Sequence, residues 1–249
     1  ICDGKRCPVC EKRHCKEVHS NCDPIPASGK IKASANTMYN TMKNTYPDGP
    51  ETFAFSDFEN LLRTNGHNEN SIGLSYYSDE EVYRLRELKT GNSPTSVKVT
   101  IFTTTVATIH NHPNGTPPSG IDFLNTAKWV SDNNVYSTTY VYTTNGNYAL
   151  YIEDVQKAKL FYSKYSNCLS DTETKMFKAE SDLDKKWESI YKELKGLSDT
   201  DRHMMSLAEL AEQTNSGIRI LKSEPSSSNS FGLYYTQTID DKIIPYNCK

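Results

Sequence analysis

Runs of β-branched and aromatic residues predict several strands in the first part of the chain. They lie near 71–77, 81–88, 96–110, 136–144 and 147–153, and such residues suit the half-buried surface of a pleated sheet. Apolar residues with helical spacing follow Ser119 as far as about Ser131, and Asn145-Gly146 is a strong hairpin signal. The pattern predicts an α+β fold of the α/β/α type, in which a mainly antiparallel mixed sheet is flanked by helices.

Helical patterns dominate the remainder of the chain. They extend over 155–165, roughly 171–195 and 201–214, and short strands are expected at 218–221 and 231–235. The middle helix carries an apolar stripe formed by Met176, Leu183, Trp187, Ile190 and Leu194. A stripe of this kind indicates packing against a core rather than a cofactor site.

Shifts in composition divide the chain into three parts. Residues 1–32 form a Cys-rich N-terminal segment with a linker, and 33–165 form the central domain, which is entered through a helix-like patch. Residues 166–249 form a helical C-terminal extension with short terminal strands.

Charge and hydropathy argue against two classes of partner. The 249 residues carry a net charge of -3 with a pI near 6.1, and no basic stripe with interleaved aromatic residues suggests a nucleic-acid surface. The mean hydropathy is -0.68, and no run approaches the roughly 20 apolar residues of a membrane span. We therefore expect no nucleic-acid partner and no membrane span in this chain.

The chain begins with Ile1, so we expect a trimmed or processed product, or part of a longer protein, with any leader or anchor upstream. Its content of Tyr, Asn, Thr and Ser is reminiscent of exported bacterial proteins. This composition is compatible with an exported or cell-envelope location, and it leaves the compartment open.

Five cysteines crowd the start of the chain, namely Cys2, Cys7, Cys10, Cys15 and Cys22. The spacing Cys-x-x-Cys is that of a zinc knuckle, and the interspersed histidines are further candidate ligands. The alternative is a segment pinned by disulfides, with the two later cysteines as distant partners. Few apolar residues surround the cluster, so the segment has no core of its own and depends on metal or disulfides for any fixed structure.

The segment His110-Asn111-His112 carries the most specific chemistry. It ends the β-branched run that begins near Val97, and side chains at positions i and i+2 of a strand leave the same face. His110 and His112 are therefore expected to point at one place, while Asn111 faces the other side.

A stiff loop and a helix start come after this pair. Three prolines and the turn dipeptide Asn114-Gly115 restrict the loop over 113–118. Ser119 is expected to cap a helix, whose Asp122 then returns toward the histidines. Two imidazoles and one carboxylate leave the fourth position of a tetrahedral Zn²⁺ open, as in catalytic zinc sites.

This segment resembles the motif of the JAMM (MPN+, JAB) metalloproteases, which is an upstream Glu, then His-x-His-Pro, then Ser-x-x-Asp. The wording His-Asn-His-Pro is also similar to bacterial RadC-type members. The resemblance implies a zinc ion held by His110, His112 and Asp122. It also implies a Glu that acts as general acid/base on the metal-bound water, and a role for Ser119 in stabilising the tetrahedral oxyanion. The match is specific over 109–122 and, with the upstream strands, extends over about 51–153.

The family's Glu lies on an early strand, ahead of a Gly-apolar pair. Glu69 fits this place, although its gap to Gly73 is one residue longer than usual. The loop between the second His and the Ser is in turn one residue shorter than the family pattern. The fallback candidates on the next strand are Glu80, Glu81 and Glu87. A carboxylate in this role takes a proton from the metal-activated water and passes it to the leaving amine.

The sequence thus predicts a zinc-dependent hydrolase of peptide or isopeptide bonds with a peptide or protein substrate. The loops around 66–70 and 113–118 are expected to form its groove. A non-catalytic binding or scaffold module on the same fold is the alternative. The letters His-Asn-His also prompt an HNH nuclease, but that motif spreads over a long ββα segment, and this acidic chain has no phosphate-tracking surface. The substrate and the oligomeric state stay open.

Overall fold

A computed structural model describes residues 28–45, 53–64, 67–170, 176–223, 230–239 and 242–248. The N-terminal cysteine cluster, Cys2 to Cys22, lies outside the described residues, so the choice between zinc and disulfides stays a prediction. The predicted division of the chain into three parts likewise stays a prediction.

The described residues contain six α-helices and eight strands. The helices are α1 (Ser28–Asn44), α2 (Phe55–Thr64), α3 (Gly120–Asp132), α4 (Val155–Tyr165), α5 (Asp182–Glu193) and α6 (Asp199–Gln213), with a short 3₁₀ turn η1 (Ser166–Cys168) after α4. The strands are β1 (Asn70–Tyr77), β2 (Val82–Thr90), β3 (Thr105–Asn111), β4 (Thr138–Thr143), β5 (Gly146–Ile152), β6 (Ile218–Ser223), β7 (Phe231–Ile239) and β8 (Lys242–Cys248).

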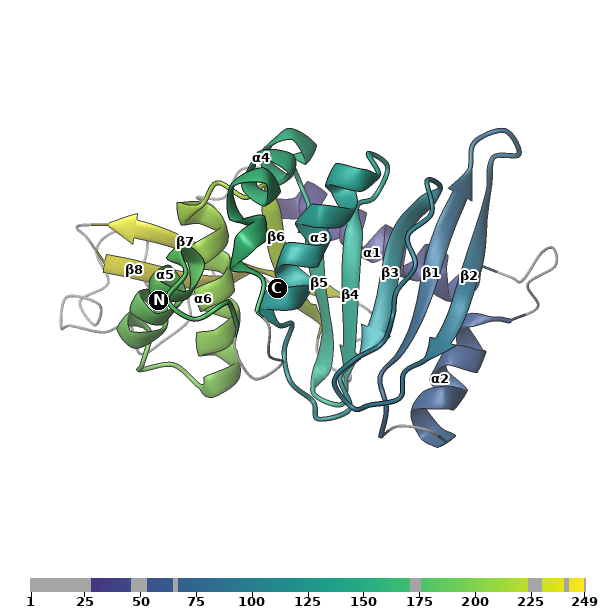
Figure 1. The fold of residues 1–249 in the computed structure, drawn as a ribbon, viewed down its shortest axis with the longest axis horizontal. Coiled ribbons are helices and arrows are strands. Elements are labelled where there is room, and N and C mark those ends of the chain that lie inside the picture. The colour runs from purple at the N-terminus through teal and green to yellow at the C-terminus, as the bar shows by residue number, and fades with distance from the viewer. Residues whose placement is uncertain are drawn as a thin grey trace.

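All eight strands belong to one open sheet with the order β2-β1-β3-β4-β5-β6-β7-β8 (Figure 1). Only β3 and β4 pair in parallel, and α3 connects them, whereas the other neighbours are antiparallel. The predicted α+β class with a mainly antiparallel mixed sheet is therefore confirmed. Ligands in mixed and parallel sheets commonly bind beyond the carboxyl end of a parallel strand, and here that end of β3 carries the two histidines.

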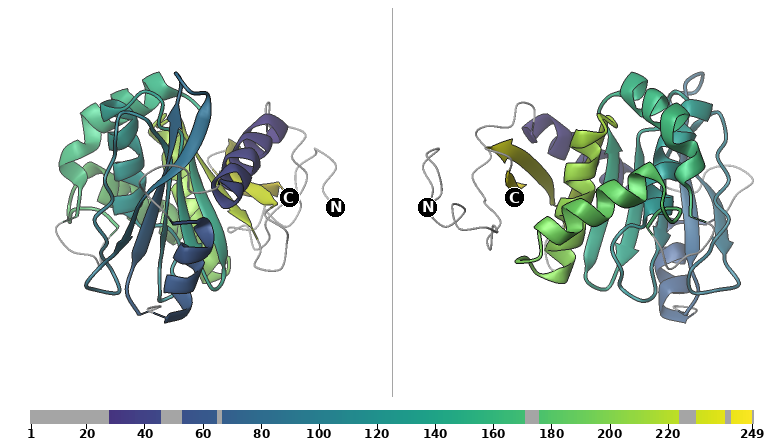
Figure 2. Two further views of the ribbon diagram at one scale, coloured as in Figure 1. Left: turned by 90° about the vertical axis from the view of Figure 1, so that its right-hand side faces the viewer. Right: turned by 60° about the vertical axis from the view of Figure 1, so that its left-hand side comes forward.

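Helices cover both faces of the sheet (Figure 2). Helices α1 and α2 pack on one face, where Tyr39, Phe58 and Tyr140 are among the buried residues. Helices α3 to α6 pack on the other face, with Phe123 and Trp187 in the second buried cluster. Among the described helices, none has both the length and the apolar character needed to cross a bilayer.

The connection between β2 and β3 corrects the long strand predicted over 96–110. Strand β1 lies between β2 and β3 and is antiparallel to both, so the chain must travel back along the sheet before β3 begins. Residues 97–104 make this crossover, and a turn in which the Thr105 amide donates to the Phe102 carbonyl, at 3.0 Å, precedes β3. β-propensity alone does not distinguish a strand from an extended crossover, because both are extended and half-buried.

The helix predicted over 171–195 is also shorter than expected. Helix α5 begins at Asp182, where the Ser181 side chain caps it by accepting from the Asp184 amide, so Met176 precedes the helix. Strand β8 was not predicted, and it extends the sheet beyond β7. Strands β6 to β8 thus continue the same sheet that carries the histidines.

Candidate metal centre

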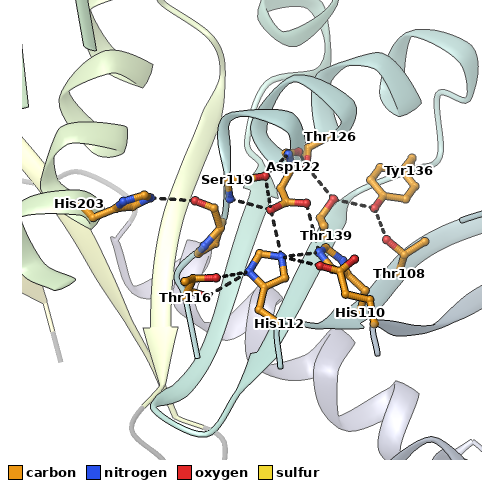
Figure 3. Close-up of polar contacts among 12 residues, drawn as sticks. Thr108, His110, His112, Thr116, Ser119, Asp122, Thr126, Tyr136, Thr139 and His203 are labelled. Atoms are coloured by element: carbon orange, nitrogen blue, oxygen red, sulfur yellow. Dashed lines mark hydrogen bonds and ion pairs between the residues drawn. The ribbon is translucent and has the colours of Figure 1, made fainter. Parts of the chain in front are cut away.

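Strand β3 is buried along its whole length and ends at the histidine pair, with His110 in the strand and His112 directly after it. The His112 amide donates to the Tyr142 carbonyl at 2.9 Å, which extends the pairing with β4 one residue past the end of β3. As alternation in a strand requires, both rings lie on one side, and their Nε2 atoms are 3.1 Å apart (Figure 3). The predicted convergence of His110 and His112 is present.

Asp122 reaches the histidines because it occupies the first turn of α3. The Ser119 side chain accepts from the Asp122 amide at 3.1 Å, and Asp122 Oδ2 accepts from the Ser119 amide at 2.6 Å, which completes a capping box. Asp122 Oδ1 lies 3.1 Å from His110 Nε2, and Oδ2 lies 3.5 Å from His112 Nε2. Together, His110, His112 and Asp122 are called the metal centre.

The spacing of these donor atoms fits a single tetrahedral cation. Ligand atoms about 2.0–2.2 Å from a tetrahedral zinc lie roughly 3.3–3.6 Å from one another. The separations here are 3.1 Å between the two Nε2 atoms and 3.1 and 3.5 Å from them to the carboxylate. All three residues are buried, and their ligand atoms lie within 4.8 Å of one another. The group is therefore a possible metal-binding site made of two His and one Asp.

The loop after β3 fixes the ring of His112. Its Nδ1 atom is 3.0 Å from the Thr116 carbonyl, which only accepts, so Nδ1 donates and Nε2 keeps its lone pair. The loop turns back at Gly115, which has φ +70° and donates its amide to the His112 carbonyl. By contrast, Nδ1 of His110 is buried and has no partner among the described residues.

Burial and charge set the protonation of the metal centre. Burial lowers the pKa of His110, but Asp122 and Glu69 raise it to a net value above the ordinary one. Burial also lowers the pKa of His112, which stays below its ordinary value despite Asp122. Burial raises the pKa of Asp122, but the two histidines hold it well below its usual range. An ionised carboxylate and a neutral imidazole are the forms that bind metal.

Glu69 lies beside the metal centre, just ahead of β1. It is buried, and its Oε1 is 3.8 Å from His112 Nε2. Both backbone groups of Glu69 are hydrogen-bonded. Its amide donates to the Ser93 carbonyl at 3.0 Å, and its carbonyl accepts from the Gly91 amide at 2.7 Å.

Asn111 faces away from its two histidine neighbours and holds the residues on either side of Glu69. Its Oδ1 accepts from the Asn70 amide at 2.6 Å, and its Nδ2 donates to the Asn68 carbonyl at 3.2 Å. The strand that positions the histidines therefore also positions the carboxylate.

The fallback acids occupy other places. Glu80 and Glu81 lie in the turn between β1 and β2 and are exposed. Glu87 lies on β2, where it pairs with Lys89, and this contact lowers its pKa. Among the four candidates, the structure brings Glu69 to the histidines.

A chain of buried hydroxyls ties α3 to the sheet behind Asp122. Thr126 donates to the Asp122 carbonyl at 2.7 Å, and it lies 2.6 Å from Thr139. Thr139 is 2.8 Å from the Tyr136 hydroxyl, which is 2.7 Å from Thr108 (Figure 3). Each hydroxyl has one proton, so every bond must point the same way, from Thr108 toward α3. Burial raises the pKa of Tyr136, which keeps this phenol protonated.

A cavity of about 410 Å³ opens onto the metal centre. Glu69, Asn114 and Thr116 line it, as the predicted loop positions imply. Residues 94–99 of the connection between β2 and β3 and the exposed edge of α3 supply further lining that the sequence did not predict. The α3 residues are Ile121, Asn125, Lys128 and Trp129.

Sequence patterns missed Thr116, Tyr136 and the positioning role of Asn111. A Tyr or Thr in a strand is typical of any sheet, so nothing local identifies the hydroxyl chain. For Asn111 there was one signal in the sequence: it is a polar residue between two histidines, on a strand whose other residues are mostly suited to burial.

Comparisons with known proteins place the chain in no family. No family model matches it, and no curated protein or solved structure gives a match. Any function assigned to the chain therefore depends on the geometry of the metal centre and the chemistry of its residues.

Proposed function

We propose that the chain is a zinc-dependent hydrolase of peptide or isopeptide bonds. The observation that carries this proposal is the convergence of His110, His112 and Asp122 at separations suited to one tetrahedral ion. Three protein ligands with an open fourth position are typical of catalytic zinc, whereas structural zinc usually has four. The resemblance to the JAMM motif supports the same function.

Zinc is the cation that suits the donor set best. Imidazole nitrogen with one carboxylate oxygen is a common zinc combination, while Mg²⁺ and Ca²⁺ prefer oxygen ligands alone. When bound, such an ion lowers the pKa of a water and polarises a carbonyl oxygen.

Glu69 is the group we assign to proton transfer. Its carboxylate faces the metal centre from the side of His112 and takes a proton from the attacking water. The carboxylic acid then returns this proton to the departing nitrogen as the C–N bond breaks. One water is consumed, and a carboxylate and an amine are released.

We assign Ser119 to stabilisation of the oxyanion, which the resemblance implies. In the structure its hydroxyl donates to Asp122 Oδ2 at 2.8 Å, so this role requires the hydroxyl to rotate toward the cavity that it lines. A donor of this kind contributes about 3 kcal/mol to transition-state stabilisation. The cavity between the crossover and α3 is where we place the peptide chain of the substrate.

Metal content gives the first test. The purified wild type is expected to hold about one zinc per chain by plasma mass spectrometry, and His112→Ala is expected to lose it. The matched control is His67→Ala, because His67 is an exposed histidine and its loss should leave the zinc content unchanged. An unchanged metal content in His112→Ala would remove the basis of the proposal.

Cleavage of a peptide library by the zinc-loaded protein gives the second test. Glu69→Gln is expected to reduce the rate by about 10²–10⁴-fold with zinc retained, since it removes the general base. Glu81→Gln, at an exposed fallback acid, should behave like the wild type. A protein that binds zinc but cleaves no peptide or isopeptide substrate would instead be the non-catalytic binding module.

A further inference from the structure

His203 connects helix α6 to the loop of the metal centre. Its ring is half-buried and lies edge-on to Trp187 of α5, with ring centroids 5.1 Å apart. Its Nε2 atom is 2.8 Å from the carbonyl oxygen of Pro118, the residue before Ser119 (Figure 3). Because a carbonyl only accepts, Nε2 carries the hydrogen and donates it.

Pro118 ends the loop of residues 113–118, here called the metal loop. A proline has no amide hydrogen, so the carbonyl is its one backbone hydrogen-bonding group, and His203 occupies it. Other bonds also hold the metal loop: His112 donates to the Thr116 carbonyl at 3.0 Å, and Asn145 donates to the Gly115 carbonyl at 3.3 Å.

A second contact joins the C-terminal part of the chain to the same place. A Cβ atom on Gly120 would overlap the carbonyl oxygen of Met176 and press on the ring of Phe177. The first residue of α3 therefore lies directly against the backbone that leads into α5. The Phe177 ring in turn contacts Trp187, with centroids 6.3 Å apart, so both contacts belong to one packed group.

We infer that His203 is a positioning residue for the metal centre. By donating to Pro118 it fixes the end of the metal loop, and thereby the Thr116 carbonyl that orients His112 and the Ser119 cap that orients Asp122. This inference rests on the metal site of the proposed function and adds that the C-terminal helices form part of its support. Partners beyond the direct ligands influence metal affinity in this way.

The test compares two substitutions that differ in one donor. His203→Gln keeps a side-chain N–H able to reach the Pro118 carbonyl, whereas His203→Phe keeps a ring against Trp187 but removes the donor. Zinc affinity is measured by competition with a chromophoric chelator. His203→Phe is expected to bind about tenfold more weakly than the wild type, as for a lost outer partner, and His203→Gln is expected to stay close to it.

Hydrogen exchange of the metal-free proteins gives a readout that needs neither zinc nor activity. Peptides covering 112–122 should exchange faster in His203→Phe than in the wild type, and His203→Gln should restore the slow exchange. Ile190→Ala is the control, because it removes buried apolar volume from α5 without removing a polar group. It should lower the melting temperature and leave exchange over 112–122 unchanged.

Equal exchange in His203→Phe and the wild type would overturn the inference, and so would equal zinc affinity. Equal loss in His203→Gln and His203→Phe would also overturn it, because the donor would then be irrelevant. These outcomes are separate from the proposed function. A wild type that binds zinc but hydrolyses nothing would contradict the hydrolase while leaving the role of His203 intact.

Discussion

Strand β3 and the helical pair α5–α6 both contribute buried residues, but of different chemistry. The residues that the helices bury are mainly apolar, with Ser206 and Glu209 as the buried polar residues of the pair. All seven residues of β3 are buried, and Thr105, Thr108, His110 and Asn111 among them are polar. The buried face of α5 is apolar, formed by Leu183, Trp187 and Ile190.

This difference separates a strand that carries the chemistry of the site from helices that mainly supply hydrophobic packing. A buried polar group costs free energy unless it has a partner, so a strand that buries four of them is expected only where the partners are built in. The partners of these polar groups lie in α3, in β1 and, for Tyr136, in the segment just before β4. The helical pair supplies hydrophobic packing, and His203 is the polar contact by which it reaches the metal loop.

The largest effect on stability is expected in the helical pair. Leu183→Ala removes a fully buried side chain and should lower the free energy of unfolding by about 2–5 kcal/mol, because the cavity refills only in part. Zinc affinity should stay unchanged, since no ligand or partner is lost. Denaturant unfolding with and without zinc measures both the free energy of unfolding and the zinc affinity. A weaker zinc affinity in this variant would show that packing in the helical pair also supports the metal centre.

The polar region should respond more weakly to loss of a hydroxyl. Tyr136→Phe leaves Thr108 without an acceptor and Thr139 without a donor, so we expect a loss of about 1–3 kcal/mol. Thermal unfolding is the measurement. Tyr165→Phe, on α4, is the control, and an equal change in the two variants would mean that the hydroxyl chain contributes nothing particular.

Asn111→Ala should affect the position of the Glu69 carboxylate without affecting the metal ligands. The change releases the residues flanking Glu69, while His110 keeps its place in β3 and the His112 amide keeps its bond to the Tyr142 carbonyl. Zinc content should therefore be retained, and hydrolysis should fall about tenfold through misplacement of the base. Exposed Asn92→Ala is the control. Loss of zinc together with activity would show that Asn111 supports the histidines instead.

The smallest effect is a pH dependence at the junction of the two regions. Burial lowers the pKa of His203 below its ordinary 6.5, although the hydrogen bond to Pro118 raises it; His112 lowers it further and Asp122 raises it. The unfolded chain then binds the proton more readily than the folded one. The contribution of neutral His203 to the free energy of unfolding is therefore complete above pH 6.5 and is lost as the pH falls toward the folded pKa.

Melting temperatures between about pH 5 and pH 7.5 test this, because His is the side chain that titrates in that range. The acid-side decrease should be shallower in His203→Gln than in the wild type. Parallel curves for the two proteins would assign the acid sensitivity to other groups.

Much of the metal centre could be predicted because its parts are local. Alternation along a strand brings His110 and His112 together, and the three-residue spacing of a capping box places Asp122 in the first turn of α3. The choice of Glu69 over Glu80, Glu81 and Glu87 rests in the sequence on resemblance alone, since these residues are far from the histidines along the chain. Pairing of β1 with β3 decides it in space.

The sequence by itself therefore determined the strand, loop and helix start that hold two imidazoles and a carboxylate, because short-range periodicity and capping depend on neighbours in the chain. Only the tertiary structure decided that residues 97–104 cross the sheet, that Tyr136 braces α3 and that His203 holds the metal loop. These depend on which elements become neighbours in space, and no local pattern encodes a contact across eighty-five residues.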